Sequence, residues 1–171
     1  MTKTALFCAA ALLLGSAPAL AAGPTDPQIA HIAYTAGNLD VAAAKQALAR
    51  SHNKAVRSFA QQMIRDHQAV NAKALALVKK LHVTPEDNAT SQGLTKAAAA
   101  EHAKLAKLKG AAFDRAYVEN EIAYHKTVNG ALDSTLIPSA KNGELKSLLE
   151  TGLTLFREHQ AHAEQVAKAL K

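Results

Sequence analysis

Residues 53–81 have the sequence NKAVRSFAQQMIRDHQAVNAKALALVKKL. Apolar side chains recur in this stretch at alternating steps of four and three residues, the spacing of the buried face of a bundle helix. The stripe consists of Val56, Ala60, Met63, His67, Val70, Ala74, Leu77 and Leu81. We expect Ser51 to cap this helix and Pro85 to follow its end. His67, an ionisable ring, lies in the middle of an otherwise apolar stripe.

Three further long helices are predicted along the chain. The first spans residues 26–50, with an aspartate cap and a proline in its first turn, and a short joint makes it an antiparallel hairpin with the helix of residues 53–81. The next spans residues 113–136 and is closed by Pro138. The last follows an Asn-Gly turn and continues from about residue 143 to the C-terminus.

A shorter helix is predicted between the two pairs of long helices. Residues 82–93 are rich in turn-forming residues and are expected to form a loop, and a helix follows from about residue 94 to residue 109, where Gly110 ends or kinks it. Its buried side is predicted to contain Leu94, Ala98, Leu105, Leu108 and Ala112. The sequence therefore predicts an all-α, antiparallel four-helix bundle with an additional short crossover helix.

The N-terminus has the three parts of a secretory signal peptide. Residues 1–3 are a short basic segment, residues 5–15 are an apolar run, and residues 19–21 form an Ala-Leu-Ala cleavage sequence. The alternative is a membrane anchor, but the apolar run is too short to span a bilayer comfortably. We expect residues 1–21 to be removed on export to the periplasm or another exported location. Residues 22–171 are then expected to form a single domain without a stable membrane span.

Composition limits the partners of the mature chain. The single cysteine, Cys8, lies in the predicted signal peptide, so any metal must be held by histidine, aspartate or glutamate. The formal net charge of +6 falls to +5 when Lys3 is removed, and the basic residues are scattered among acidic ones. Nucleic acid is therefore not an expected partner. The sequence leaves the oligomeric state open.

Several ionisable residues share the predicted buried stripes. Glu121 and His125 lie one turn apart on the stripe of the third long helix. The stripe of the last helix consists of Leu145, Leu148, Gly152, Leu155, His159, His162, Val166 and Ala169. Asp40 lies on the stripe of the first helix or at its edge. Counted from the connecting turns, Glu121 is level with His159 and Asp40 is nearly level with His67, so the groups within each hairpin are expected to meet.

Four segments of the mature chain form a distinctive pattern: SFAQQMIRDHQAVN (58–71), AFDRAYVENEIAYHKTV (112–128), LIPSAKNGELKSLL (136–149) and FREHQAHAEQV (156–166). The most specific residues in them are Asp66, His67, Phe113, Asp114, Tyr117, His125 and His159. The pattern covers nearly all of the mature chain and resembles the domain-of-unknown-function 4142 family, exported bacterial proteins with a ferritin-like helical bundle. The resemblance implies this fold and compartment, and it implies no activity.

The chain departs from the di-iron members of the ferritin-like class, which carry two Glu-x-x-His motifs. It contains no such motif. Instead it has Glu121-x-x-x-His125, Glu158-x-x-x-His162 and His159-x-x-His162. A di-iron oxidase centre is therefore not expected.

Two interpretations of the inward-facing polar residues stay open. In the first, they bind one divalent transition-metal ion (zinc, copper, nickel or iron), since imidazole and carboxylate ligands suit these metals. The candidate ligands are His67, Glu121, His125, His159, His162 and Asp40. In the second, the histidines are hydrogen-bonded within a metal-free polar core, and the protein is a structural or interaction protein of the cell envelope. The remaining histidines are expected at the surface: His31, His52, His82 and His102.

Catalytic motifs are missing from the sequence. It has no Gly-x-Ser-x-Gly elbow, no His-Glu-x-x-His helix, no phosphate-binding loop and no cysteine nucleophile in the mature chain. We therefore expect a binding protein and not an enzyme.

Overall fold

The computed structural model of the protein describes residues 23–170. These residues form helices joined by short loops, and no strand occurs among them, so the predicted all-α class is confirmed. The predicted signal peptide, residues 1–21, lies outside the described residues. Between residues 23 and 170, no helix combines the length and the apolar character that crossing a membrane requires.

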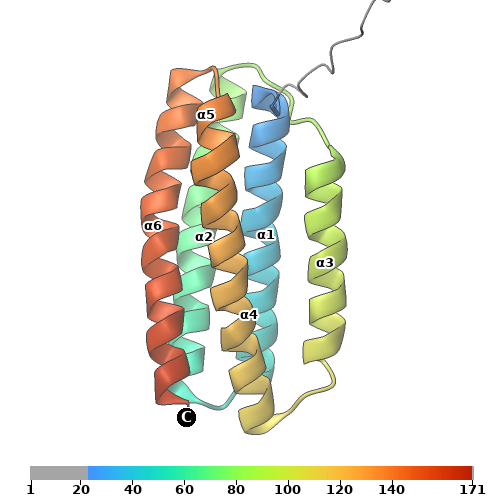
Figure 1. Ribbon diagram of the computed structural model, residues 1–171, viewed down its shortest axis with the longest axis vertical. Helices are drawn as coiled ribbons and strands as arrows, with labels where there is room; N and C mark the ends of the chain where they lie inside the picture. The colour runs from blue at the N-terminus through green and yellow to red at the C-terminus, as the bar shows by residue number, and fades with distance from the viewer. Residues whose placement is uncertain (1–22, 171) are drawn as a thin grey trace, which may run out of the picture.

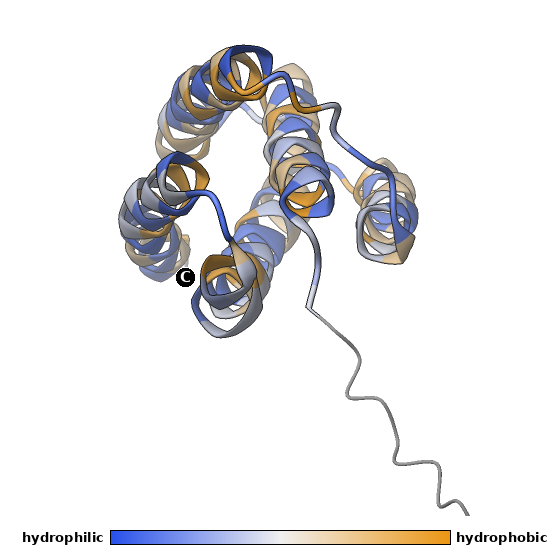
Figure 2. Ribbon diagram, turned by 90° about the horizontal axis from the view of Figure 1, so that it is seen from above, coloured by the Kyte–Doolittle hydropathy of each residue, from blue (hydrophilic) through white to orange (hydrophobic). Residues whose placement is uncertain are grey.

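Four long helices lie side by side around a common core (Figures 1 and 2). They are α1 (Asp26–Arg50), α2 (Lys54–Lys80), α4 (Gly110–Ala131) and α6 (Gly143–Ala169). α1 and α2 form one antiparallel hairpin, α4 and α6 lie together as a second antiparallel pair, and α2 also packs against α6. α3 (Ala89–Leu105) lies outside this group, against α1, and carries the chain from one end of the molecule to the other.

The N-terminal caps of the first two helices differ from the prediction. The cap of α1 is Thr25, one residue before the predicted aspartate, and its backbone N–H donates to Oε1 of Gln28 at 3.1 Å. α2 is capped by Asn53 and not by Ser51, because Asn53 Oδ1 accepts hydrogen bonds from the second and third amides that follow it, at 2.9 and 3.3 Å. Ser51 is instead the C-cap of α1, and its backbone N–H donates to the carbonyl of Ala47.

The crossover helix begins five residues earlier than predicted. Asn88 caps it by accepting hydrogen bonds from two backbone amides, each at 3.1 Å, so α3 starts at Ala89, inside the predicted loop. Gly110 begins α4, and its φ of +55° is a left-handed conformation that favours glycine. Of the predicted buried side only Leu105 is buried, because α3 covers the outside of the bundle. Leu94, Ala98 and Leu108 are half-buried and Ala112 is exposed.

Pro138 does not close the helix that precedes it. The chain continues from α4 through a π-helical turn (Leu132–Leu136) into the short helix α5 (Ile137–Ser139). A proline has no N–H to donate and crowds the carbonyl group four residues earlier. That carbonyl belongs to the wider π-helical turn, which gives the proline ring room inside a continuous helical segment.

The core differs between the two halves of the bundle. The half that holds the starts of α2 and α4 is packed with large, fully buried side chains, among them Val56, Phe59, Met63, Phe113, Tyr117 and Val118. The other half is lined by aliphatic side chains and one aromatic ring: Ile29, Ile32, Leu132, Leu136, Leu145, Leu149, Leu153 and Phe156. This second half also encloses a cavity of about 650 Å³.

Several predicted core positions are less buried than expected. In α6, Leu149, Leu153 and Phe156 are buried, whereas Leu148 and Leu155 are half-buried. A straight helix has 3.6 residues per turn and drifts away from a strict seven-residue repeat, so the buried face turns relative to the predicted stripe. The other positions of the stripes predicted for α2 and α6 that are only half-buried or exposed are Val70, Ala74, Leu77, Leu81, His162 and Ala169.

We expect Met63→Ala to lower the free energy of unfolding by about 2–5 kcal/mol, because this side chain is fully buried in the densely packed half. Leu77→Ala, at a half-buried position of the same helix, is expected to lower it by only about 1 kcal/mol, since less apolar surface is lost from the core. Urea unfolding of both variants beside the unaltered protein measures the difference. Equal losses at the two positions would contradict the described packing.

Candidate metal centre

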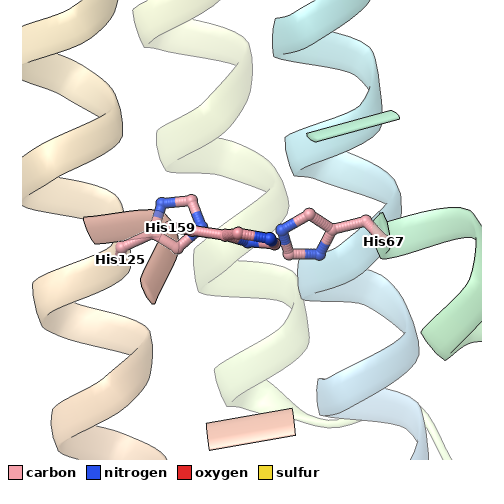
Figure 3. Close-up of side chains that lie close together, drawn as sticks. All are labelled: His67, His125 and His159. Atoms are coloured by element: carbon pink, nitrogen blue, oxygen red, sulfur yellow. The ribbon is translucent and has the colours of Figure 1, made fainter. Parts of the chain in front are cut away.

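Three histidine rings meet near the middle of the bundle (Figure 3). His67 comes from α2, His125 from α4 and His159 from α6. The ring centroids of His67 and His125 are 5.7 Å apart, those of His67 and His159 are 5.2 Å apart, and those of His125 and His159 are 5.5 Å apart. All three residues are at most 3% exposed, so the cluster is shielded from solvent.

Two of the rings have one nitrogen held by an acceptor. Nδ1 of His125 donates to the backbone carbonyl of Glu121 at 3.0 Å, and Nε2 of His159 lies 3.0 Å from Oδ2 of Asp66 on α2. The other two nitrogens, Nε2 of His125 and Nδ1 of His159, are buried and have no hydrogen-bond partner within residues 23–170. Each of these nitrogens therefore carries the free lone pair of a neutral imidazole, the form that ligates a metal.

Asp40 adds a carboxylate from α1. Its Oδ2 lies 3.4 Å from Nε2 of His67 and 3.6 Å from Nε2 of His125. Neither nitrogen of His67 has a hydrogen-bond partner in the described part of the chain. Glu121 approaches from α4, with Oε2 3.7 Å from Nδ1 of His125. All four long helices thus contribute an ionisable side chain to one place.

Burial changes the protonation of the two acids. It raises the pKa of Asp40 to about 7, and a side-chain hydrogen bond with Glu121 acts in the opposite direction. The pKa of Glu121 is raised well above its usual range, first by burial and then by the charge of Asp40. Glu121 therefore keeps its proton, so the pair carries at most one negative charge at neutral pH.

Burial also keeps the imidazoles neutral. It lowers the pKa of His125 to about 4, although the hydrogen bond with the Glu121 backbone acts in the opposite direction. The pKa of His67 lies well below its usual range because of burial and of repulsion from the other two rings. The pKa of His159 is lowered by burial, against the opposing effect of Asp66. These rings are therefore in the state that binding a metal requires.

The donor atoms are close enough together to hold one ion. His67, His125 and His159 each offer one nitrogen, and these three nitrogens lie within 4.8 Å of one another. A second group consists of one donor atom each from Asp40, Glu121 and His125, which also lie within 4.8 Å of one another. In a tetrahedral site with bonds of about 2.0–2.1 Å, the donor atoms are about 3.3 Å apart. The two contacts of Asp40, at 3.4 and 3.6 Å, are already near this value.

His162, a predicted ligand, is not brought into this cluster, although it follows His159 by one turn of α6. Its Nδ1 lies 2.9 Å from Oε1 of Gln62, and its ring packs edge-on against Phe59 with centroids 5.3 Å apart. The four histidines predicted at the surface belong to neither group of donor atoms in the described chain. His52 and His82 are exposed, and His31 and His102 are half-buried.

Two supporting contacts were not predicted from the sequence. In the sequence Asp66 is part of the family pattern alone, because its contact with His159 depends on α2 and α6 being neighbours. Consecutive residues of a helix point about 100° apart, so an acid beside the inward-facing His67 lies at the rim of the core, where it reaches the next helix. Phe156 stacks on His67 with centroids 4.7 Å apart and planes 14° apart, and it covers one face of the ring.

Comparison with known proteins identifies a family but no function. A family model described as a domain of unknown function (DUF4142) matches residues 11–166, nearly the whole chain. The chain matches no curated protein and no solved structure.

In the metal-free protein, we expect the His125 ring to stay neutral until the pH approaches about 4. In the unfolded chain the same ring takes up a proton near pH 6.5. Its contribution to stability is therefore fully present above pH 6.5 and is lost as the pH falls towards 4. NMR spectra of the histidine side chains, recorded across this range, measure the protonation directly.

The control for this titration is His125→Asn, which removes the group and is expected to reduce the loss of stability between these pH values. A His125 ring that takes up its proton at or above pH 6.5 in the folded protein would contradict the expectation.

Proposed function

The chain belongs to the DUF4142 family, and we propose that it is an exported protein that binds one divalent transition-metal ion in the middle of its helical bundle. The observation that carries the proposal is the convergence of buried nitrogens without hydrogen-bond partners in residues 23–170: Nε2 of His125, Nδ1 of His159 and both nitrogens of His67. An unpaired buried polar group costs about 1–3 kcal/mol. One metal ion would satisfy several of these atoms at once.

The donor set favours a particular class of ion. Neutral imidazoles suit zinc, copper, nickel and iron, whereas calcium and magnesium prefer oxygen ligands. Asp66 and the Glu121 carbonyl hold the far nitrogens of His159 and His125, as the outer partners of ligating histidines do in metal sites. A di-iron centre of the ferritin-like kind uses four glutamates, and this cluster offers only Asp40 and Glu121 as buried acids.

We propose that the ion is bound and not used in turnover. Three histidines and Asp40 would fill all four positions of a tetrahedral ion, as in structural zinc sites, and leave none for a substrate. Export is supported by the N-terminal sequence, with its short apolar run and Ala-Leu-Ala cleavage sequence.

The competing function is that of a structural or interaction protein of the cell envelope with a metal-free polar core. One observation favours it: burial raises the pKa of Glu121, and the proton that Glu121 keeps removes part of the buried charge without a metal ion. The two proposals differ in the response of the protein to added metal.

We expect the mature protein, purified without a histidine tag and treated with a chelator, to bind one equivalent of Zn²⁺ in a calorimetric titration. Its melting temperature should rise with the ion, because a ligand of the folded state stabilises that state. Alanine at His67, His125 or His159 should weaken binding by more than about 100-fold, the upper end of the loss that follows removal of an outer partner.

His162→Ala is the matched control, because His162 lies one turn from His159 on α6 and its Nδ1 contacts Gln62. This variant should bind Zn²⁺ as the unaltered protein does. If the unaltered protein bound neither Zn²⁺ nor Cu²⁺ saturably, and the variants at His67 and His159 lost stability, the metal-free polar core would be the correct description.

Asp66→Asn is expected to weaken Zn²⁺ binding by about 10–100-fold, because Asp66 holds the ring of His159 through Nε2. Asp66 is half-buried at the rim of the core, so the fold should be retained. Glu158→Gln, at an exposed acid beside His159, removes the same charge without touching the ring and should have little effect. Equal losses in the two variants would mean that Asp66 acts through its charge alone and does not orient His159.

A further inference from the structure

A cavity of about 650 Å³ occupies the half of the bundle that holds the starts of α1 and α6. Its wall is mainly apolar and includes Ile32, Val70, Leu77 and Leu149. The cavity reaches the surface beside the start of α3, where the exposed Thr90 belongs to its wall. Its volume lies in the range of sites that bind small organic molecules.

The wall of the cavity selects against charge. Among the described residues, no aspartate, glutamate, lysine or arginine lines it. A charged group inside would lose its hydration without gaining a partner of opposite charge, which is strongly unfavourable. The wall therefore fits an uncharged and mainly apolar molecule.

The cavity is elongated along the helices. Its wall spans residues 67–78 of α2, residues 145–156 of α6, and residues 124–136 of α4 and the π-helical turn after it. These spans cover eleven or twelve helical steps, and at a rise of 1.5 Å per residue this is about 16–18 Å. With carbon–carbon bonds of about 1.5 Å, an extended aliphatic chain of about twelve carbon atoms has a similar length.

The inner end of the cavity is formed by two rings with unused nitrogens, His67 and His125, and the unused Nε2 of His125 faces Asp40 at 3.6 Å. His67 belongs to the cavity wall and is only 3% exposed. Its Nε2 faces Asp40 at 3.4 Å, so Nδ1 is the nitrogen left for another partner, and residues 23–170 supply none. In a neutral ring whose Nε2–H faces the Asp40 carboxylate, Nδ1 carries the lone pair and would accept a hydrogen bond from a hydroxyl group of a ligand. A metal ion at Nε2 would place the proton on Nδ1, which would then donate to the oxygen of the same hydroxyl group, so a hydroxyl group suits the ring with or without the ion.

We propose that this cavity binds an uncharged aliphatic molecule with one hydroxyl group. The hydroxyl group forms a hydrogen bond with Nδ1 of His67 at the inner end, and the aliphatic chain extends through the cavity towards the start of α3. The aliphatic chain of the ligand fits because the cavity wall has small side chains on three helices: Ala33, Ala36, Ala74 and Ala131.

The test uses the chelator-treated protein and a neutral fluorescent probe, N-phenyl-1-naphthylamine, which 1-decanol is expected to displace with saturation. Ala74→Phe and Ala131→Phe fill the cavity from α2 and α4 and should weaken 1-decanol binding by about tenfold or more. Ala72→Phe is the matched control, because Ala72 is an exposed residue of α2 outside the cavity wall. Circular dichroism and thermal melts verify that the three variants are folded.

Comparison with decanoate tests the orientation of the ligand. At pH values where decanoate is charged, it should bind about tenfold or more weakly than 1-decanol, because its carboxylate would be buried without a cationic partner. Equal binding of the two would mean that the head group stays at the mouth, and it would overturn the assignment to His67.

Two results would overturn the cavity as the binding site: no saturable displacement by 1-decanol, or displacement that neither filled variant weakens. Repeating the titration with Zn²⁺ present separates the two proposals. Failure to bind Zn²⁺ would not change the result obtained with the metal-free protein, and failure to bind 1-decanol would not change the metal titration.

Discussion

The rest of the structure depends on one constraint: the ionisable groups in the middle of the bundle are removed from water. Three imidazoles and two carboxyl groups lie there, each at most 3% exposed. Burial keeps the rings neutral and leaves the proton on Glu121, so little net charge is enclosed. The four long helices must hold these side chains at one level, because a shift along any helix would leave Asp40 or a ring without its neighbours.

One half of the core is filled by large apolar side chains, and the other half contains the cavity. Phe59, Met63, Phe113 and Tyr117 fill one half with large buried side chains, and these contacts supply much of the apolar stabilisation. The other half can therefore keep a cavity, since binding regions are drawn from the less stable parts of a protein. α3 covers the outside of α1, and a smaller cavity of about 300 Å³ beneath it reaches Asp40 and Glu121.

His67 joins the two proposed sites. Its Nε2 faces Asp40 and the other rings, its Nδ1 is free for a ligand of the cavity, and one face of its ring stacks on Phe156. The orientation of this imidazole is therefore fixed from several sides. A ligand at Nδ1 and a metal ion at Nε2 would use opposite sides of the same ring, and neither would displace the other.

The sequence by itself determined the helical class and the inward position of the main polar residues. The spacing of apolar residues was sufficient to place His67, Glu121, His125 and His159 on buried faces, because a helix puts every third or fourth residue on the same side. It left Asp40 on the stripe or at its edge, and only the packing of α1 shows that this side chain is buried. The cap of α3 was also present in the sequence as Asn88, but the many turn-forming residues around it favoured a loop.

Only the tertiary structure decided which polar residues meet. His159 and His162 are both compatible with the predicted stripe, and the rotation of α6 against α2 directs one ring to the cluster and the other to Gln62. The contact of Asp66 with His159 and the cavity above the rings likewise arise from the packing of separate helices. Helical periodicity depends only on residues that are near one another in the sequence. Which side chains face each other across the core depends on how each helix is rotated about its axis and shifted along it relative to the other helices.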